Sequence, residues 1–119
     1  MTAYRTRQEI LSIGYIGVMK QGGPSVNARG FCAYRGDEGR RCHIGHLIDD
    51  DSYSKRLEGR DAGKPSVRKA ANISPDDRKF VIRLQNAHDM AWRFDFCADY
   101  TRRVKAIADE YGLEMPEVA

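Results

Sequence analysis

The C-terminal part of the sequence carries the pattern that most constrains the fold, two successive segments with apolar residues at helical spacing. The first segment begins at Ser74, and a serine N-cap followed by proline is typical of a helix start, so we expect a helix over 75–92. A second helix is expected over 95–111, ending at Gly112. Two amphipathic helices in succession must bury their apolar stripes against the rest of the chain.

An N-terminal helix is expected over 6–21. Thr6 and Glu9 fit a capping box, in which the hydroxyl and the carboxylate satisfy backbone N–H groups at the helix start. The Gly-Gly-Pro stretch that follows ends the helix. Gly14 and Gly17 each cost a helix about 1 kcal/mol relative to Ala. We therefore expect another backbone segment to pack closely against them.

Residues 28–46 fit a β-hairpin. Two short segments with alternating side chains flank the turn Gly-Asp-Glu-Gly at 36–39. The alternation predicts one apolar face, made of Cys32, Tyr34, Cys42 and Ile44. A two-stranded hairpin is marginal in water, so this face is expected to lie on helices.

The remaining segments complete the expected fold. We expect a short helix over 50–58, a mobile polar connector over 60–72 and a flexible tail over 113–119. A length of 119 residues fits a single domain over 1–119. The sequence thus predicts an α+β fold, in which the two C-terminal helices pack on one face of the hairpin.

Charge and cysteine count indicate the class of partner and the compartment. The 20 Lys and Arg against 17 Asp and Glu give a net charge of +3, a smaller excess than dedicated nucleic-acid binders usually show. No apolar run approaches the ~20 residues of a membrane helix, and the N-terminus has no signal-peptide pattern. Three cysteines, an odd number, then favour free thiols in a reducing cytoplasm. We expect a soluble cytoplasmic protein with no membrane partner.

Cysteines and histidines are the candidates for chemistry. Cys32 and Cys42 are expected to face each other across the hairpin, and with His46 and His88 they could form a zinc site. Nine residues separate the two cysteines, however, and structural zinc sites use closer pairs. The same thiols with His88 and Asp89 are the candidate nucleophile, base and orienting group of a cysteine enzyme. We favour the third interpretation, buried thiols that act as small hydrophobic groups without a cofactor.

Basic residues form the candidate partner-binding surface. Arginines on the outer hairpin face and a basic run in the following connector suit either a protein partner or a nucleic-acid backbone. The candidate residues are Arg35, Arg40, Arg41, Lys55, Arg56, Arg60, Lys64, Arg68 and Lys69. Aromatic side chains that stack on single-stranded bases are sparse on that face, which favours a protein partner.

Two stretches resemble a family of small, uncharacterised phage and bacterial proteins. The shared pattern is Cys-x-Tyr-Arg at 32–35, a glycine-containing turn, Cys-x-x-Gly-x-Leu-Ile at 42–48, Tyr53, and Leu-Gln-x-x-His-Asp at 84–89. The resemblance implies no activity and no catalytic residues. It implies a phage or mobile-element setting, in which small proteins often act by blocking a host machine.

Three hypotheses about function follow from the sequence. We favour a phage-type accessory protein that binds a host protein, as an inhibitor of a host or anti-phage defence machine; an anti-CRISPR role is one example. A nucleic-acid binder that uses the basic hairpin and loop is the second hypothesis. A zinc- or cysteine-dependent enzyme is the third.

Overall fold

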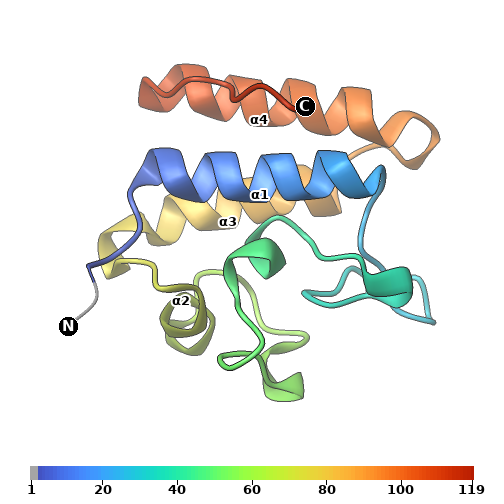
Figure 1. Cartoon of the computed structure of the whole chain (residues 1–119), viewed down its shortest axis with the longest axis vertical. Helices are drawn as coiled ribbons and strands as arrows, with labels where there is room; N and C mark the ends of the chain where they lie inside the picture. Colours follow the sequence, from blue (N-terminus) through green and yellow to red (C-terminus); the bar gives the residue numbers. More distant parts are fainter. Residues whose placement is uncertain (1–2) are drawn as a thin grey trace.

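The structure, a computed structural model, describes residues 3–119 and is built almost entirely from helices and loops (Figure 1). The α-helices are α1 (Arg7–Gln21), α2 (Pro65–Ala71), α3 (Arg78–Asp89) and α4 (Phe96–Tyr111). Helix α4 packs beside both α1 and α3, and the turn Ile44–Leu47 packs against α1. Within residues 3–119, no helix has the length and the apolar character that a bilayer crossing requires.

Helix α1 confirms the predicted capping box. The Glu9 backbone N–H donates to Thr6 Oγ1 at 3.1 Å, and the Thr6 N–H donates to Glu9 Oε1 at 2.8 Å. The helix ends at Gly22, whose φ of 81° lies in the left-handed region that favours glycine. The local sequence signals at both ends therefore define this helix.

The seam between α1 and the turn Ile44–Leu47 explains the two glycines inside the helix. A Cβ on Gly14 would lie 2.2 Å from the His43 ring, and one on Gly17 would lie 2.5 Å from the His46 ring. The close neighbours are thus histidine side chains, where we expected backbone. We call this contact, made by Gly14, Gly17, His43 and His46, the histidine seam.

His43 is completely buried in the histidine seam, with both ring nitrogens bonded. The Tyr100 hydroxyl lies 2.6 Å from Nδ1, and the Ile10 carbonyl lies 3.0 Å from Nε2. Because a carbonyl only accepts, Nε2 carries the proton and Nδ1 accepts from Tyr100. Burial lowers the pKa of His43 to about 3.

Helices α3 and α4 form as predicted, with small shifts at their ends. Ser74 caps the start, since its hydroxyl accepts from the Asp76 N–H at 3.2 Å, and the first turn is 3₁₀ over Pro75–Asp77. Helix α3 ends at Asp89, short of the expected residue 92. Helix α4 ends at the left-handed Gly112, as predicted.

The predicted α+β class is wrong, because residues 28–46 form no hairpin. In this region the described chain forms just two isolated antiparallel bridges, Val26 with Cys32 and Arg35 with Arg41. The alternation predicted by sequence also fails beyond the turn, since residues 42–45 are all buried. A segment buried on every side cannot present one face to a core and the other to water.

Gly45 shows how the second arm of the supposed hairpin is placed. A Cβ at this position would lie 2.2 Å from the Tyr34 carbonyl oxygen. The 3₁₀ turn Ile44–Leu47, which contains Gly45, therefore packs directly against the backbone of the first arm at Tyr34. This close approach replaces the ladder of hydrogen bonds that a hairpin would have.

Two further predictions between the hairpin and α3 are also wrong. Residues 50–58 contain only the 3₁₀ turn Lys55–Leu57, which Ser54 caps. The segment 60–72, expected to be a mobile connector, contains α2, with Pro65 in its first turn and two buried apolar residues. Two apolar positions one turn apart are too weak a pattern to reveal so short a helix.

The C-terminal tail over 113–119 has no regular structure but lies on α1. The Glu114 N–H donates to Gln8 Oε1 at 3.0 Å, and Gln8 Nε2 donates to the Glu114 carbonyl at 2.9 Å. Leu113 and Met115 pack against the core. The tail thus covers part of the N-terminal helix.

Candidate functional site

Cys32, His88 and Asp89 are brought together at the C-terminal end of α3. Each offers one ligand-type atom, and these atoms lie within 4.8 Å of one another. Cys32 lies on the loop that precedes the turn at 36–39, and its backbone forms an isolated antiparallel bridge with Val26. The guanidinium of Arg93 donates to Cys32 Sγ at 3.1 Å. This group is the nearest match to the predicted metal or catalytic site.

His88 is committed to structure through both ring nitrogens. The backbone N–H of Ser25 donates to Nε2 at 2.9 Å, so this nitrogen carries a lone pair and no proton. The other nitrogen, Nδ1, therefore bears the proton and donates to Asp89 Oδ1 at 2.8 Å. A metal on Nδ1 would move the proton to Nε2, where it would face the Ser25 N–H. The arrangement therefore fits a metal ion poorly.

The same tautomer leaves the Cys32 thiol without a general base. A thiolate nucleophile needs a lone pair nearby to accept its proton, and neither nitrogen of His88 has one to spare. Burial, followed by the charge of Asp89, raises the pKa of Cys32. In the predicted Cys–His–Asp arrangement His88 thus offers Cys32 no general base, and the hydrogen bond from Arg93, which favours the thiolate, does not outweigh burial.

The other two residues of the predicted zinc set lie elsewhere in the network. Cys42 is fully buried, and its sulfur accepts from the Gly45 N–H at 3.4 Å. His46 packs against Gly17 and lies 3.0 Å from Gln21 Oε1 through Nε2. Within residues 3–119, no group of three ligand-type atoms includes either of them.

Gln85 and Asp89 extend this network into a strut between α3 and two loops. Gln85 Nε2 donates to Asp89 Oδ1 at 2.8 Å, and the Ile44 N–H donates to Gln85 Oε1 at 3.1 Å. Together with the bond from Ser25 to His88, these contacts tie the loop before Cys32 and the turn after Cys42 to one helix. The Leu-Gln-x-x-His-Asp pattern therefore has a structural role here.

Glu58 organises the Cys-x-Tyr-Arg segment in a similar way. Its carboxylate accepts from the backbone N–H groups of Tyr34 at 2.9 Å and Arg35 at 3.1 Å. It also accepts from the Tyr53 hydroxyl at 2.7 Å. The Arg35 guanidinium lies 4.3 Å from the centre of the Tyr53 ring. Packing between loops thus also explains the Cys-x-Tyr-Arg part of the shared pattern.

The predicted basic surface is divided by these contacts. Arg35 and Arg41 both pair with Asp50, at 2.8 and 3.3 Å, and the Arg40 guanidinium lies 3.9 Å from the Glu38 carboxylate. Arg68 is half-buried and donates to the Gly63 carbonyl. The exposed members of the set are Lys55, Arg56, Arg60, Lys64 and Lys69. Ion pairs thus engage the three arginines of the expected hairpin, while the later basic residues remain at the surface.

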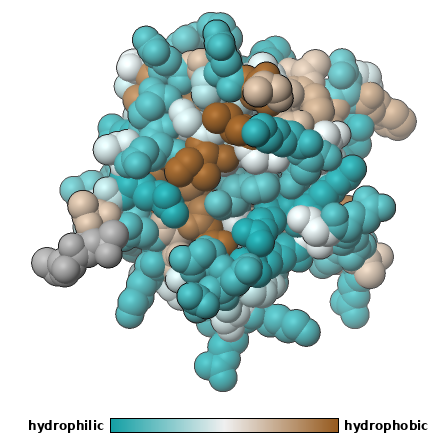
Figure 2. All heavy atoms as spheres, in the orientation of Figure 1, coloured by the Kyte–Doolittle hydropathy of each residue, from teal (hydrophilic) through white to brown (hydrophobic). Residues whose placement is uncertain are grey.

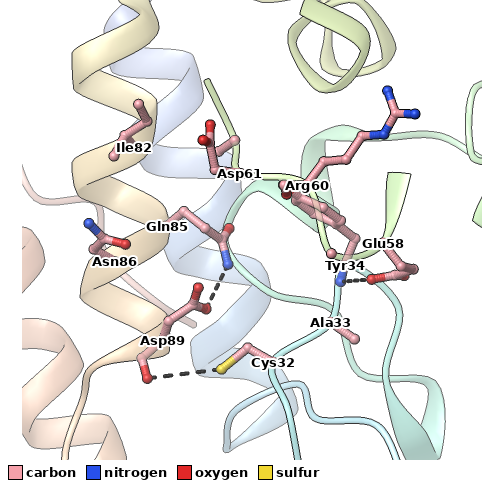
Figure 3. Close-up of a pocket in the computed structure, with 12 residues that line it drawn as sticks. Cys32, Ala33, Tyr34, Glu58, Arg60, Asp61, Ile82, Gln85, Asn86 and Asp89 are labelled. Carbon is pink, nitrogen blue, oxygen red and sulfur yellow. Dashed lines mark hydrogen bonds between the residues drawn. The ribbon is translucent and has the colours of Figure 1, made fainter. Parts of the chain in front are cut away.

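A cavity of about 260 Å³ lies beside this strut, between α3 and the segment 58–62 (Figure 3). Three carboxylates line it, those of Glu58, Asp61 and Asp89. The other residues that line it are Cys32, Ala33, Tyr34, Gly59, Arg60, Ala62, Ile82, Gln85 and Asn86. Sequence reasoning named Cys32 and Asp89 but missed Glu58 and Asp61, because only the fold brings these carboxylates to one cavity.

Large apolar side chains are exposed where α3 runs into α4. Met90, Trp92 and Phe94 are 64%, 62% and 86% exposed, and the rings of Trp92 and Phe94 meet edge to face at 5.6 Å. Phe31, 65% exposed, lies on the loop that Cys32 anchors to Arg93. We call these four residues the aromatic corner. Figure 2 shows apolar surface at the upper right, where Figure 1 places the α3–α4 connection.

A charged frame holds the α3–α4 connection in place. The Asp99 carboxylate accepts from the Trp92 N–H at 2.9 Å and pairs with Arg102 and Arg103, at 2.9 Å to the latter. The backbone hydrogen bond and the two arginines lower the pKa of Asp99 well below its usual range. The sequence analysis assigned no functional role to Trp92 or Phe94.

Comparisons of the chain with protein-family models, with curated proteins and with solved structures found no match.

Proposed function

We propose that this chain is a binding protein that docks on a partner protein through the aromatic corner. The observation that carries the proposal is the exposure of Trp92 and Phe94, each at least 62% exposed, on one short connection. Contiguous exposed apolar surface on a folded protein commonly marks an interaction site. Burying a side chain of this size is worth roughly 1.5–3 kcal/mol, and this free energy is available to a partner.

The composition of the corner suits a protein partner. Trp and Arg are enriched among the residues that dominate binding energy at protein interfaces, and Arg93 lies between Trp92 and Phe94. The hydrogen bond from Trp92 to Asp99 holds the connection before binding. A preformed surface loses less conformational entropy when the partner arrives.

The identity of the partner is proposed from the resemblance to small phage and bacterial proteins. A chain from that setting would meet bacterial proteins, so the proposed partner is a host protein or a defence complex that the chain blocks in the host cytoplasm. Neither cysteine chemistry nor a zinc ion enters this proposal, since His88 supports neither.

The test is capture of the partner from a nuclease-treated bacterial lysate on the tagged full-length chain. We expect a stoichiometric protein to be retained by the wild type and to fall at least tenfold with Phe94→Asp, because the substitution puts a charge at the centre of the contact. Binding of the purified partner to both chains would then give the affinity.

Tyr4→Asp is the matched control. Tyr4 is 57% exposed but lies beside α2, at a different place on the surface, so this variant should retain the partner. Equal retention by Phe94→Asp would refute the role of the aromatic corner. A protein that is captured from an untreated lysate but not from the nuclease-treated one would instead point to nucleic acid and to the exposed basic run after residue 54.

A further inference from the structure

We propose that the surface formed by α2 and the start of α3 binds a single strand of nucleic acid. This inference concerns a different place on the surface from the aromatic corner and does not rest on the protein-binding proposal. Residues 55–79 carry eight basic and four acidic side chains, whereas the rest of the chain carries 12 and 13. The positive net charge of the chain therefore comes from this one segment, and such a concentration of charge is typical of nucleic-acid binders.

Two adjoining hollows bring part of this charge together, where α2 lies beside the loop that leads into α3 (Figure 1). The first hollow, of about 380 Å³, is lined among others by Tyr4, Arg68, Lys69 and Asn72. The second, of about 330 Å³, is lined among others by Arg7, Asp76, Arg78 and Lys79. Pro75 lines both hollows and so connects them. We call the two hollows together the basic groove.

Four of the five cations that line the basic groove have no carboxylate partner. Arg7 pairs with Asp77 at 2.7 Å. No ion pair within residues 3–119 involves the others, which are Arg68, Lys69, Arg78 and Lys79. Asp76 supplies the one carboxylate among the lining residues. The groove therefore keeps a net positive charge, which attracts an anionic ligand.

Other carboxylates of the same segment are used inside the chain. Glu58 accepts from two backbone N–H groups and from the Tyr53 hydroxyl, and Asp61 accepts from the Gly63 N–H at 2.8 Å. These carboxylates fix loops, so they do not neutralise the lysines and arginines of the groove. The arginines of the expected hairpin differ in this respect, since two of them share the carboxylate of Asp50.

Tyr4 is held at the edge of the basic groove by Asn72. The Asn72 Nδ2 group donates to the Ala3 carbonyl at 2.9 Å, and the Arg5 N–H donates to the Asn72 carbonyl at 3.1 Å. These bonds fix the residues on both sides of Tyr4, which is itself 57% exposed. Proteins that bind single strands combine cations, which meet the phosphates, with exposed aromatic rings, on which bases stack. The groove presents both.

The composition of the basic groove favours a nucleic-acid strand over a protein. Of the large hydrophobic side chains exposed within residues 3–119, Tyr4 alone lines the groove. The groove therefore lacks the apolar centre that a protein interface buries. A duplex keeps its bases stacked inside, so a single strand is the form that can offer the face of a base to Tyr4. DNA and RNA strands share this chemistry.

The experiment is a titration of a fluorescent oligothymidine of about 15 nucleotides with the full-length protein, followed by anisotropy at low salt. A matched oligouridine tests RNA. We expect saturable binding of at least one strand, and a preference for either one identifies the type of strand and supports the inference. If each of the four unpaired cations meets one phosphate, the affinity should fall about 50-fold between roughly 50 and 200 mM salt.

Two sets of variants test the groove itself. The double variant Lys69→Gln, Lys79→Gln removes one exposed cation from each hollow, so it should weaken binding at least fivefold and reduce the salt dependence. Tyr4→Ala should also weaken binding at least fivefold, whereas Tyr4→Phe should bind like the wild type because it keeps the ring on which a base stacks. Wild-type affinity in the double variant or in Tyr4→Ala would overturn the inference.

The double variant Lys20→Gln, Arg29→Gln is the matched control, because it also removes two exposed cations but neither lines the groove. It should bind the strand nearly as the wild type does. Phe94→Ser should also bind normally, and a loss of affinity in this variant would place the strand at the aromatic corner instead. No binding at low salt, an equal loss in the control, or tighter binding of a duplex or of polyglutamate would overturn the inference and leave the protein-binding proposal untouched.

Discussion

The histidine seam and the aromatic corner reverse the usual distribution of residues in opposite ways. The seam buries imidazole rings, whereas the corner exposes Trp and Phe. In the seam, every ring nitrogen of His43 has a partner inside the chain, so the polar groups are compensated there. At the corner, the apolar groups have no such compensation. The buried polar network has all its hydrogen-bond partners inside the chain, whereas the exposed apolar groups are the basis on which an outside partner is proposed.

Gly14→Ala should have the largest effect on stability, because Gly14 makes the closest contact in the histidine seam. In an exposed helix this change stabilises by about 1 kcal/mol, but here the new methyl group would lie 2.2 Å from the His43 ring. The ring cannot move without losing its hydrogen bonds to Tyr100 and Ile10. We expect a loss of roughly 3 kcal/mol in the free energy of unfolding, measured by urea denaturation.

Gly17→Ala is the matched comparison for that measurement. It also meets a histidine, but His46 is only half-buried and bonds to the side chain of Gln21, so it can yield. The free energy of unfolding should fall clearly less for Gly17→Ala than for Gly14→Ala. A stabilised Gly14→Ala variant would mean that the seam is not closely packed.

Acid should weaken the seam and leave the corner unaffected. Burial lowers the pKa of His43 to about 3 and that of His46 to about 4, so the unfolded chain binds more protons than the folded chain below pH 6.5. The stability is therefore full above pH 6.5 and is lost as the pH falls towards these values. Between pH 7 and pH 5 we expect a loss on the order of 1–2 kcal/mol for the fully buried His43 and a smaller loss for the half-buried His46, which solvent screens.

Urea denaturation at several pH values measures this loss. The variant His46→Gln keeps a side-chain donor near Gln21 but does not titrate, so it should lose the smaller part of the pH dependence. A wild-type stability that is constant from pH 7 to pH 5 would contradict the assignment of both histidines as buried neutral groups.

Phe94→Ser should have the smallest effect on stability. The side chain is 86% exposed, so its removal should change the free energy of unfolding by less than about 0.5 kcal/mol. Thermal and urea denaturation would check this value. A loss above about 1 kcal/mol would show that the corner contributes to the fold, and would weaken the argument that it awaits a partner.

Local signals in the sequence predicted those parts of the fold that depend on neighbouring residues. The Thr6 capping box, the Ser74 cap and the left-handed Gly112 all act within one turn of a helix. The prediction of a hairpin failed because residues 42–45 are buried against α1, which is remote in sequence. The two glycines in α1 were noticed, but the histidines that fill the space beside them could not be inferred from spacing.

The candidate sites were predicted less completely than the helices. Cys32, His88 and Asp89 lie together, but Cys42 and His46, which the predictions had grouped with them, do not. The bond from the Ser25 backbone that fixes the His88 tautomer is visible only in the fold. The cavity adds Glu58 and Asp61 from a loop that sequence reasoning had treated as a helix and a connector. The exposure of the aromatic corner depends on where the rest of the chain lies, and no local sequence pattern encodes that.

The chain contains a single tryptophan, and it sits at the aromatic corner. Intrinsic emission excited at long ultraviolet wavelengths therefore comes from this one position, without any label. In water the indole should emit towards the red, and contact with another molecule should shift the spectrum to the blue. The protein thus carries its own optical probe at the place where docking is proposed.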